Sequence, residues 1–400
     1  MSPTHLIIVE KGHQVPDKIS TKIIFGGDFV PSGGYAQLTS NSSKDVFGDV
    51  RQIIKEADLT IINLEAPLRH LDGTEIEKVG PSLHATPSVL KTLSTAGVDA
   101  VCLANNHIFD YGEAGLDRTL SALHAHAIRH VGAGLTREAA ETPLRLQTAG
   151  RHISIFSFAE REFNLSADGQ AGAAIFDPIR IAPIIMKERL NTDALIVIFH
   201  GGNEYFSYPN PQLRKICQFL IEIGTDAVIG HHPHVPGPYE IYKGKPIVYS
   251  LGNLIFDRSM PPPGWDEGYL ASLDLRFNES HLDSIDLKLI PYHQSVALEG
   301  IRLMEGKKRI TFLAEIEKMR DQLENYPDQW RAEWDAFVEN RRAQIFIDLS
   351  SPLRFPGIRR LMEIGIFRKF VMPRSRQIRR LNLLRCDSHR ELVIAALSQQ

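Results

Sequence analysis

Cysteine is scarce in this chain of 400 residues, which holds only Cys102, Cys217 and Cys386. Three such scattered residues exclude a disulfide framework and a metal site built of thiolates, and they suit a reducing compartment. Long apolar runs are also missing, since no stretch reaches the roughly 18 uncharged apolar residues of a membrane-spanning helix. The N-terminus lacks the basic head and apolar core of a signal peptide. These absences predict a cytoplasmic protein that does not span a membrane.

A strong overall charge is missing as well. The formal net charge is -3 and 43% of the residues are hydrophobic, which is ordinary for a globular protein and gives no reason to expect a nucleic-acid partner. The length exceeds one ordinary core, so it predicts a large domain with an appendage, or two domains. We assign residues 20–305 to one α/β domain and residues 306–400 to a helical, basic C-terminal extension.

Short β-rich runs alternate with helical patterns from residue 20 onward, which is typical of a layered α/β architecture. The helices predicted over residues 87–97 and 211–224 both end at a glycine. The predicted strands include TKIIFGGD, LTIINLE, VDAVCLAN, DALIVIFH, DAVIGHH and KPIVYSLGN.

Polar side chains stand at the carboxyl ends of these strands, where ligands bind in such folds. They are Asp28, Asn63, Glu65, Asn105, Asn106, His107, His200, Glu204, His231, His232, His234 and Asn253. A single residue of this kind is usually a cap or a satisfied polar group. Their recurrence at separate strand ends instead combines carboxylate, amide and imidazole, the ligand set of Mn, Fe or Zn. The pattern therefore predicts one or two divalent transition-metal ions.

The stretch LANNHIFDYGEAG adds a chemical role to this set. The amide of Asn106 can bind a cation without adding negative charge that would repel a phosphate-like substrate. His107, one residue later, can stand at the edge of the pocket as a proton donor. Asp110 or a nearby backbone carbonyl would hold the imidazole of His107 in place.

Six segments in this order resemble a known family. They are GGD, NLE, ANNHIFDYGEAGLDRTLSAL, VGAG, GTDAVIGHHPHV and IVYSLGNLIFD, spread over roughly residues 21–300. The chain resembles the poly-gamma-glutamate capsule synthesis (CapA-like) family, a branch of the calcineurin-like metallophosphoesterase superfamily. The resemblance implies a four-layer αββα sandwich with a two-metal site at the strand ends, and a part in capsule or exopolysaccharide biosynthesis.

The same resemblance assigns roles to individual residues. It implies metal ligands at Asp28, Glu65, Asn106, His200, His232 and His234. His107 matches the catalytic histidine, with Asp110 beside it. The residues implied to contact the substrate or to support the ligands are Asn63, Asn105, Glu204, His231 and Asn253. Three positions depart from the family pattern: Val30 stands where phosphoesterases carry a histidine, Glu65 stands where a metal-bridging aspartate is usual, and Gly201 stands where the capsule family carries a tryptophan.

Two functions follow from this pattern. The first is a metal-dependent hydrolase that acts on a phosphoester or another anionic, envelope-type substrate. The second is a non-hydrolytic protein that binds or assembles a polymer, in which the metal site has become a binding pocket. The intact histidines favour the hydrolase, and the departures at Val30 and Gly201 favour the second function.

Two further segments carry open interpretations. Between residues 341 and 390, thirteen lysines and arginines are interleaved with apolar residues and outnumber the acidic ones. This pattern fits a solvated face, association with an anionic membrane surface, or binding of an acidic polymer or partner. The proline-rich stretch MPPPGWDEG at residues 260–268 predicts an exposed loop, in which Trp265 could act as a substrate lid.

Overall fold

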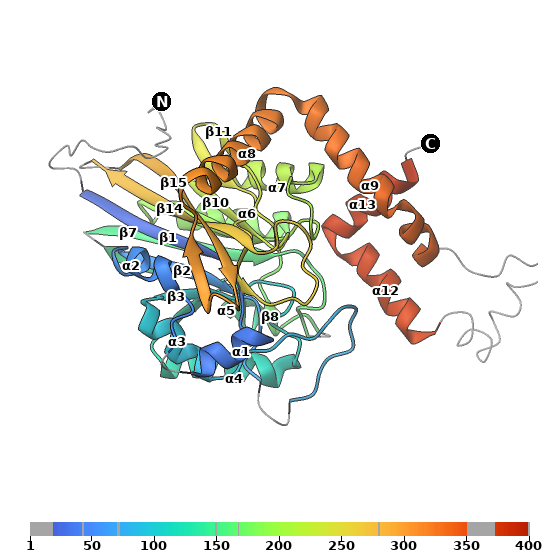
Figure 1. The fold of residues 1–400 in the computed structure, drawn as a ribbon, viewed down its shortest axis with the longest axis horizontal. Helices are drawn as coiled ribbons and strands as arrows, with labels where there is room; N and C mark the ends of the chain where they lie inside the picture. Colours follow the sequence, from blue (N-terminus) through green and yellow to red (C-terminus); the bar gives the residue numbers. More distant parts are fainter. Residues whose placement is uncertain are drawn as a thin grey trace, which may run out of the picture.

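The computed structural model describes residues 19–41, 44–69, 73–148, 150–166, 168–278, 281–349 and 373–398. Two β-sheets lie face to face, and helices cover their outer faces (Figure 1). The four-layer αββα sandwich predicted from the sequence is therefore confirmed, together with its C-terminal helices.

The first sheet is mixed and has the order β16-β15-β14-β1-β2-β3-β4, with β13 also pairing with β1. Strands β1 to β4 and β13 run parallel, while β14, β15 and β16 form an antiparallel extension. Its strands are β1 (Ile19–Val30), β2 (Leu59–Leu64), β3 (Ala100–Cys102), β4 (Arg129–Val131), β13 (Asn253–Phe256), β14 (Glu267–Phe277), β15 (Leu282–Ser295) and β16 (Gly300–Leu303).

The second sheet has the order β11-β12-β10-β9-β7-β6, with β7, β9, β10 and β12 parallel. Its strands are β6 (Leu144–Thr148), β7 (Arg151–Ala159), β9 (Ala194–His200), β10 (Ala227–His231), β11 (Tyr239–Tyr242) and β12 (Lys245–Val248). A short pair, β5 (Ala133–Gly134) and β8 (Gly172–Ala173), lies beside the two sheets.

Three apolar clusters hold these layers together. The central one joins the facing sides of both sheets, with residues such as Phe25 and Ile196 fully buried. Another lies between the first sheet and α1 (Gly34–Ser40), η1 (Gly48–Val50), α2 (Arg51–Lys55), α3 (Ser88–Ala96) and α4 (Gly112–Ala125). The third lies between the second sheet and α5 (Arg137–Ala140), α6 (Pro178–Arg189) and α7 (Pro211–Glu222). Buried strands of this kind are nearly continuous apolar runs because both of their faces are covered.

The chain crosses from the second sheet to the first between β12 and β13. The backbone of Gly252 comes so close to β1 that a Cβ on Gly27 would lie 2.0 Å from the Gly252 carbonyl oxygen. Glycine at position 27 allows this approach. As a result, Asn253 pairs in register with Asp28. The single strand predicted from KPIVYSLGN is thus two strands in different sheets.

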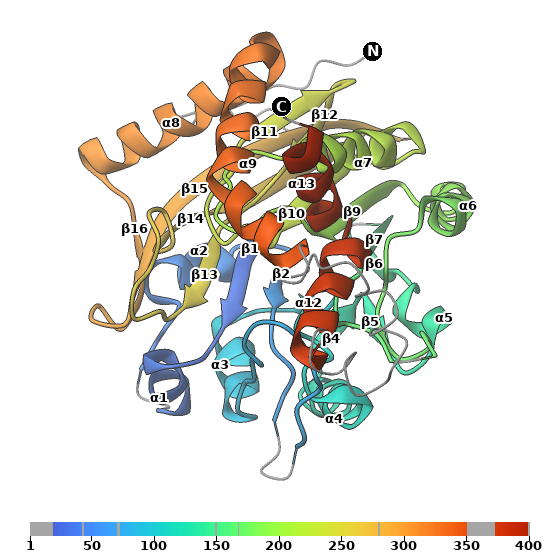
Figure 2. The ribbon, with the colours of Figure 1, turned by 90° about the vertical axis from the view of Figure 1, so that its right-hand side faces the viewer.

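The C-terminal helices lie against the α/β body. They are α8 (Gly306–Asn325), α9 (Pro327–Leu349), α12 (Arg374–Arg385) and α13 (Asp387–Ser398). Figure 2 views the face that α9, α12 and α13 cover. No helix within the described ranges is long and apolar enough to cross a membrane. Part of the basic segment, residues 350–372, lies outside the described residues, so its proposed role at a membrane or polymer stays a prediction.

Candidate metal centre

The structure brings the polar strand ends of both sheets to one buried place. Asp28 belongs to β1, Asn63 to β2, and Glu65 directly follows β2; His200 and His231 end β9 and β10. Each of these side chains is at most 2% exposed. Parallel strands from two stacked sheets thus deliver carboxylate, amide and imidazole groups to a common centre, as the sequence predicted for such strand ends.

Asp28 is the hub of one half of the centre. Its Oδ1 accepts hydrogen bonds from Asn63 Nδ2 at 2.8 Å and pairs with His231 Nδ1 at 3.0 Å, and its Oδ2 lies 3.2 Å from His234 Nδ1. Burial alone would raise the pKa of Asp28, but the bonds from His231 and His234 hold it well below its ordinary value. His231 therefore orients Asp28, as a supporting residue would.

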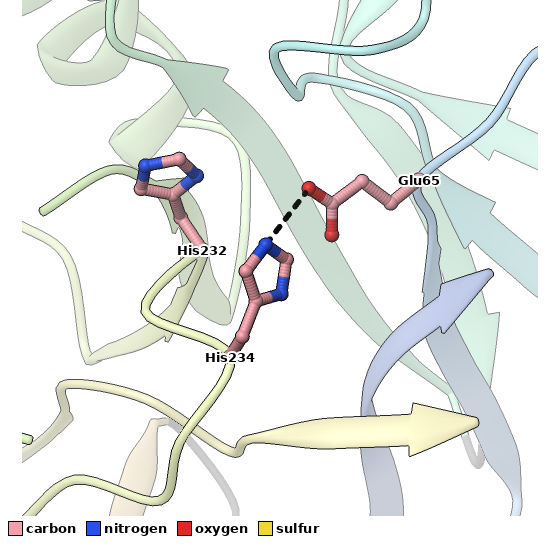
Figure 3. Close-up of side chains that lie close together, drawn as sticks. All are labelled: Glu65, His232 and His234. Atoms are coloured by element: carbon pink, nitrogen blue, oxygen red, sulfur yellow. Dashed lines mark ion pairs between the residues drawn. The ribbon is translucent and has the colours of Figure 1, made fainter. Parts of the chain in front are cut away.

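Glu65 is the hub of the other half. Its Oε1 lies 3.5 Å from His200 Nε2 and 3.8 Å from His234 Nε2, and among the described residues this buried oxygen has no hydrogen-bond partner. Figure 3 shows the Glu65 carboxylate and the His232 and His234 rings around one space. Ligand atoms of Glu65, His232 and His234 lie within 4.8 Å of one another, as do those of Asp28, Glu65 and His200.

The protonation states of the imidazoles suit a cation. Burial and the neighbouring His232 lower the pKa of His200 well below its ordinary value, and burial lowers that of His232. Both rings are therefore neutral near pH 7, the state in which imidazole binds a metal. Their nitrogens, His232 Nδ1 and His200 Nε2, face each other at 3.1 Å.

His234 behaves differently because two carboxylates surround it. Burial would lower its pKa, but Glu65 and Asp28 raise it to about 10. Burial and the charge of Asp28 in turn raise the pKa of Glu65 well above its ordinary value. This space therefore favours positive charge, and a divalent cation would stabilise the ionised form of both carboxyl groups. Together with the unpartnered Glu65 oxygen, this shows that the residues present fit one or two divalent ions.

The turn that carries these ligands is strained. His232 has φ of 103° and His234 has φ of 60°, which are positions that residues other than glycine rarely adopt. Such strain persists only where the surrounding structure fixes it, and it concentrates at functional sites. Asn253 supports this turn, because its Oδ1 accepts from His234 Nδ1 at 3.0 Å and its Nδ2 donates to the His234 carbonyl at 3.1 Å.

Trp265 corrects one expectation. Met260 is 83% exposed, as predicted for this loop, whereas Trp265 is only 1% exposed. Its indole N–H donates to the Phe256 carbonyl at 2.8 Å, and its ring centre lies 5.3 Å from that of His234. The lid interpretation is therefore wrong, because Trp265 is a fixed wall behind His234.

A row of amides connects the two sheets. Asn105 Nδ2 donates to Asn63 Oδ1 at 3.1 Å, and Asn105 Oδ1 accepts from the backbone N–H of His107. Asn106 Oδ1 lies 3.1 Å from His200 Nε2, so the amide reaches the candidate ligands from the first sheet. These contacts place Asn106 beside His200, whereas Asn63 and Asn105 bond to each other, to Asp28 and to the His107 backbone.

His107 stands at the edge of the centre. Its Nδ1 lies 2.7 Å from Asp110 Oδ2, and Asp110 also accepts from the Leu83 N–H at 2.7 Å and from Lys78. Burial and the charge of Lys78 lower the pKa of His107, opposed by Asp110. Asp110 thus fixes the ring, which leaves Nε2 as the nitrogen that can exchange a proton with a bound molecule. No motif in the sequence pointed to Lys78.

A cavity of about 350 Å³ opens beside these residues. Asn106, His107 and Glu204 line its inner side. Burial would raise the pKa of Glu204, but His234 and His232 lower it to about 2, so this carboxylate is charged in the free protein. Residues of the C-terminal extension line its outer side, namely Phe337, Arg341, Asn382, His389 and Leu392. Sequence reasoning missed these five, because the site pattern ends before residue 305.

Glu160 follows β7 and accepts hydrogen bonds from α13. Its titration predicts that the free energy of unfolding changes with pH. Burial raises the pKa of its carboxyl to about 6, although Ser388 and Cys386 donate hydrogen bonds to it. Because the folded-state pKa exceeds the unfolded value of about 4.3, the folded state holds the proton more tightly. This contribution is present below about pH 4 and is lost as pH rises through 6.

We therefore compare wild type with Glu160→Gln by urea denaturation across this range. The free energy of unfolding of wild type, relative to the variant, should fall by about 2 kcal/mol between about pH 4 and pH 7. Two curves that remain parallel throughout would show that this carboxyl titrates alike in the folded and unfolded states.

Comparison with known proteins identifies the family of the chain. The family model of the bacterial capsule synthesis protein PGA_cap matches residues 22–258. The chain belongs to this family. The matched range holds every candidate ligand and ends before the C-terminal helices, so the outer wall of the cavity lies outside that range.

Two curated relatives carry the same association with capsule synthesis. The capsule biosynthesis protein CapA of Bacillus anthracis is 27% identical over 69% of this chain and 69% of its own length. The PGA biosynthesis protein CapA of Bacillus subtilis is 29% identical over 60% of this chain and 63% of its own length. Among solved structures, a 5'-nucleotidase precursor from Thermus thermophilus has a TM-score of 0.40 at 13% identity, over 68% of this chain and 54% of that one. At that score the likeness carries no argument.

Proposed function

We propose that this member of the capsule synthesis family is a metal-dependent hydrolase that acts on a phosphoester or related anionic, envelope-type substrate during capsule or poly-gamma-glutamate-type biosynthesis. The proposal includes a cytoplasmic location, supported by three cysteines that are all free thiols. It also includes association of the basic C-terminal segment with the inner face of the membrane.

The proposal rests on the buried cluster of possible metal ligands around Glu65 Oε1, which has no hydrogen-bond partner among the described residues. Asp28, Glu65, Asn106, His200, His232 and His234 would hold the ions. When bound, one or two divalent cations supply Lewis-acid stabilisation of a phosphoryl group. Asn106 contributes a neutral ligand, so the centre retains a net attraction for an anionic substrate.

His107 provides the acid or base beside this centre. Its Nδ1 is held by Asp110 at 2.7 Å, which orients Nε2 for proton exchange with the leaving oxygen. The side chain is 6% exposed, so the cavity admits a substrate while excluding most water. Asp110 is in turn fixed by Leu83 and Lys78, which leaves the imidazole little freedom to turn.

A direct test begins with metal content. We expect protein purified without chelators, or loaded with Mn or Zn, to retain at least one ion per chain in emission spectrometry. The same preparation should hydrolyse at least one member of a panel of phosphomonoesters and phosphodiesters, and a chelator should abolish this activity. A chain that retains no ion after loading would refute the metal centre.

Non-hydrolytic binding of a polymer remains the second candidate, and one observation favours it. Val30 is fully buried in β1 and offers no ligand atom near Asp28. The metal position formed by Asp28 and His234 therefore has one nitrogen ligand fewer than the resemblance implies. A site with fewer protein ligands binds a cation more weakly, because water competes for the ion. Metal-loaded protein that binds poly-glutamate but hydrolyses no ester in the panel would favour this function.

A further inference from the structure

The C-terminal helices reach the edge of the metal centre. Phe337 and Arg341 of α9, Asn382 of α12, and His389 and Leu392 of α13 line the same cavity as Asn106 and His107. Every one of these helical residues lies outside the family match at residues 22–258. This wall of the cavity is therefore built by a part of the chain outside the family match.

Apolar packing holds this wall in place. Phe206, in the loop that follows the candidate ligand His200, contacts the rings of Trp334 and Phe337 at centroid distances of 5.5 and 4.5 Å. The same buried cluster includes Val338, Leu392 and Val393. The loop between β9 and α7 is thus clamped by α9 and α13, so it cannot move independently of them.

Polar contacts fix α13 at its first turn. Glu160 accepts hydrogen bonds from the Ser388 backbone N–H at 3.0 Å and its hydroxyl at 2.7 Å, and Asn210 Nδ2 donates to the same hydroxyl at 2.9 Å. Gly201 makes room for this arrangement, since a Cβ there would lie 2.7 Å from Glu160 Cγ. The helices are therefore part of the site's construction.

Arg341 is the group in this wall that suits an anion. Its guanidinium lies 3.6 Å from the centre of the Phe337 ring, and one N–H donates to the Glu204 carbonyl at 3.4 Å. Within the described ranges no carboxylate forms an ion pair with it, although the Glu204 charge partly opposes the lowering of its pKa by burial. A guanidinium has five donors in a planar fork, which matches a carboxylate or phosphate.

We propose that α9, α12 and α13 form the substrate-binding wall of the centre and that Arg341 binds a second anionic group of the substrate. This inference rests on the proposed hydrolase function and names its substrate class: a phosphoester with a further carboxylate or phosphate group. A cavity of about 350 Å³ is near the lower end for ligand sites, so it accommodates a small molecule or the end unit of an anionic chain.

The test uses the full-length, Mn-loaded protein and two matched series of probes. One series consists of carboxyalkyl phosphonates of increasing chain length, and the other of alkyl phosphonates of the same lengths; their P–C bond is not hydrolysed, so binding is measured at equilibrium. In isothermal titration, wild type should bind the best carboxyalkyl phosphonate more tightly than its alkyl counterpart. Arg341→Met should weaken that binding by about 10- to 100-fold, the worth of a hydrogen-bonded charge, and change the alkyl series little.

Controls separate recognition from folding. Arg342→Met removes the same charge from the next residue of α9, where the guanidinium pairs with Glu339 at 3.2 Å, and should bind both series like wild type. Metal content should be equal in all variants. If Arg341→Met does not fold, Arg341→Lys, which keeps the charge without the planar fork, should still weaken the carboxyalkyl series several-fold.

The outcomes distinguish the two claims. An Arg341 variant that binds carboxyalkyl phosphonates as tightly as wild type, or binds both series equally more weakly, would overturn the role of Arg341 while the hydrolase proposal stands. Wild-type protein that holds Mn yet binds neither series would overturn the hydrolase proposal, and the inference that rests on it.

Discussion

Replacing His232 with alanine should empty a metal position and abolish turnover with it. His232 offers one of the ligand atoms that cluster with Glu65 and His234, and its Nδ1 lies 3.1 Å from His200 Nε2. Loss of an outer partner of a metal ligand already costs about 10- to 100-fold in affinity. Loss of a ligand in a site with few nitrogens should cost more, so we expect metal analysis to find at least one ion fewer per chain.

The matched control is a histidine outside the centre. His84, a half-buried loop residue whose ring packs edge-on against Tyr111, should tolerate alanine without change in metal content. Circular dichroism of both variants checks that the sandwich is intact, since the strained turn at His232 could relax. Retention of the full metal content by a folded His232→Ala protein would contradict the assignment of His232 as a ligand.

Much of this centre could be predicted because it follows from strand ends. Asp28, Glu65 and His200 each follow a buried apolar run, and parallel strands in stacked sheets bring such ends together without further information. The local sequence pattern was therefore sufficient to predict which residues lie together in the centre. It could not supply the distances, since those depend on the separation of two sheets that only packing determines.

Other features were out of reach of local pattern. Asn253 joins Asp28 because the chain changes sheets after β12, and no periodicity marks a change of sheet within one apolar run. Lys78 reaches His107 from a loop whose course depends on tertiary contacts. Cys386 had seemed isolated in sequence, yet its thiol lies 3.1 Å from Glu160 across 226 residues.

The C-terminal helices show the same limit more strongly. Their alternating arginines and apolar residues suggested a surface that binds a membrane or polymer. Trp334, Phe337 and Val338, which precede that basic segment, share a buried cluster with Phe206 of the loop that follows β9. Binding of a membrane or polymer by the basic segment itself stays a prediction. An amphipathic pattern records that one face is apolar, but it does not identify what that face covers.

His107→Ala should separate proton transfer from metal binding. His107 lies beside the candidate ligands, but its Nδ1 is occupied by Asp110 Oδ2 at 2.7 Å, and it belongs to neither ligand cluster around Glu65. We therefore expect the variant to retain its metal while turnover of the best ester in the panel falls by roughly 10² to 10⁴, the usual effect of removing a positioned acid or base.

Asp110→Asn provides the comparison that tests the geometry. It keeps the size of the side chain but removes the charge that orients the His107 ring, so it should lower turnover less than His107→Ala and leave the metal in place. Because Lys78 also contacts Asp110, a loss of stability in this variant would be visible in thermal unfolding. If His107→Ala loses metal as readily as His232→Ala, the imidazole belongs to the coordination shell, and the acid must be sought on the opposite side of the cavity, where Arg341 and His389 face the centre.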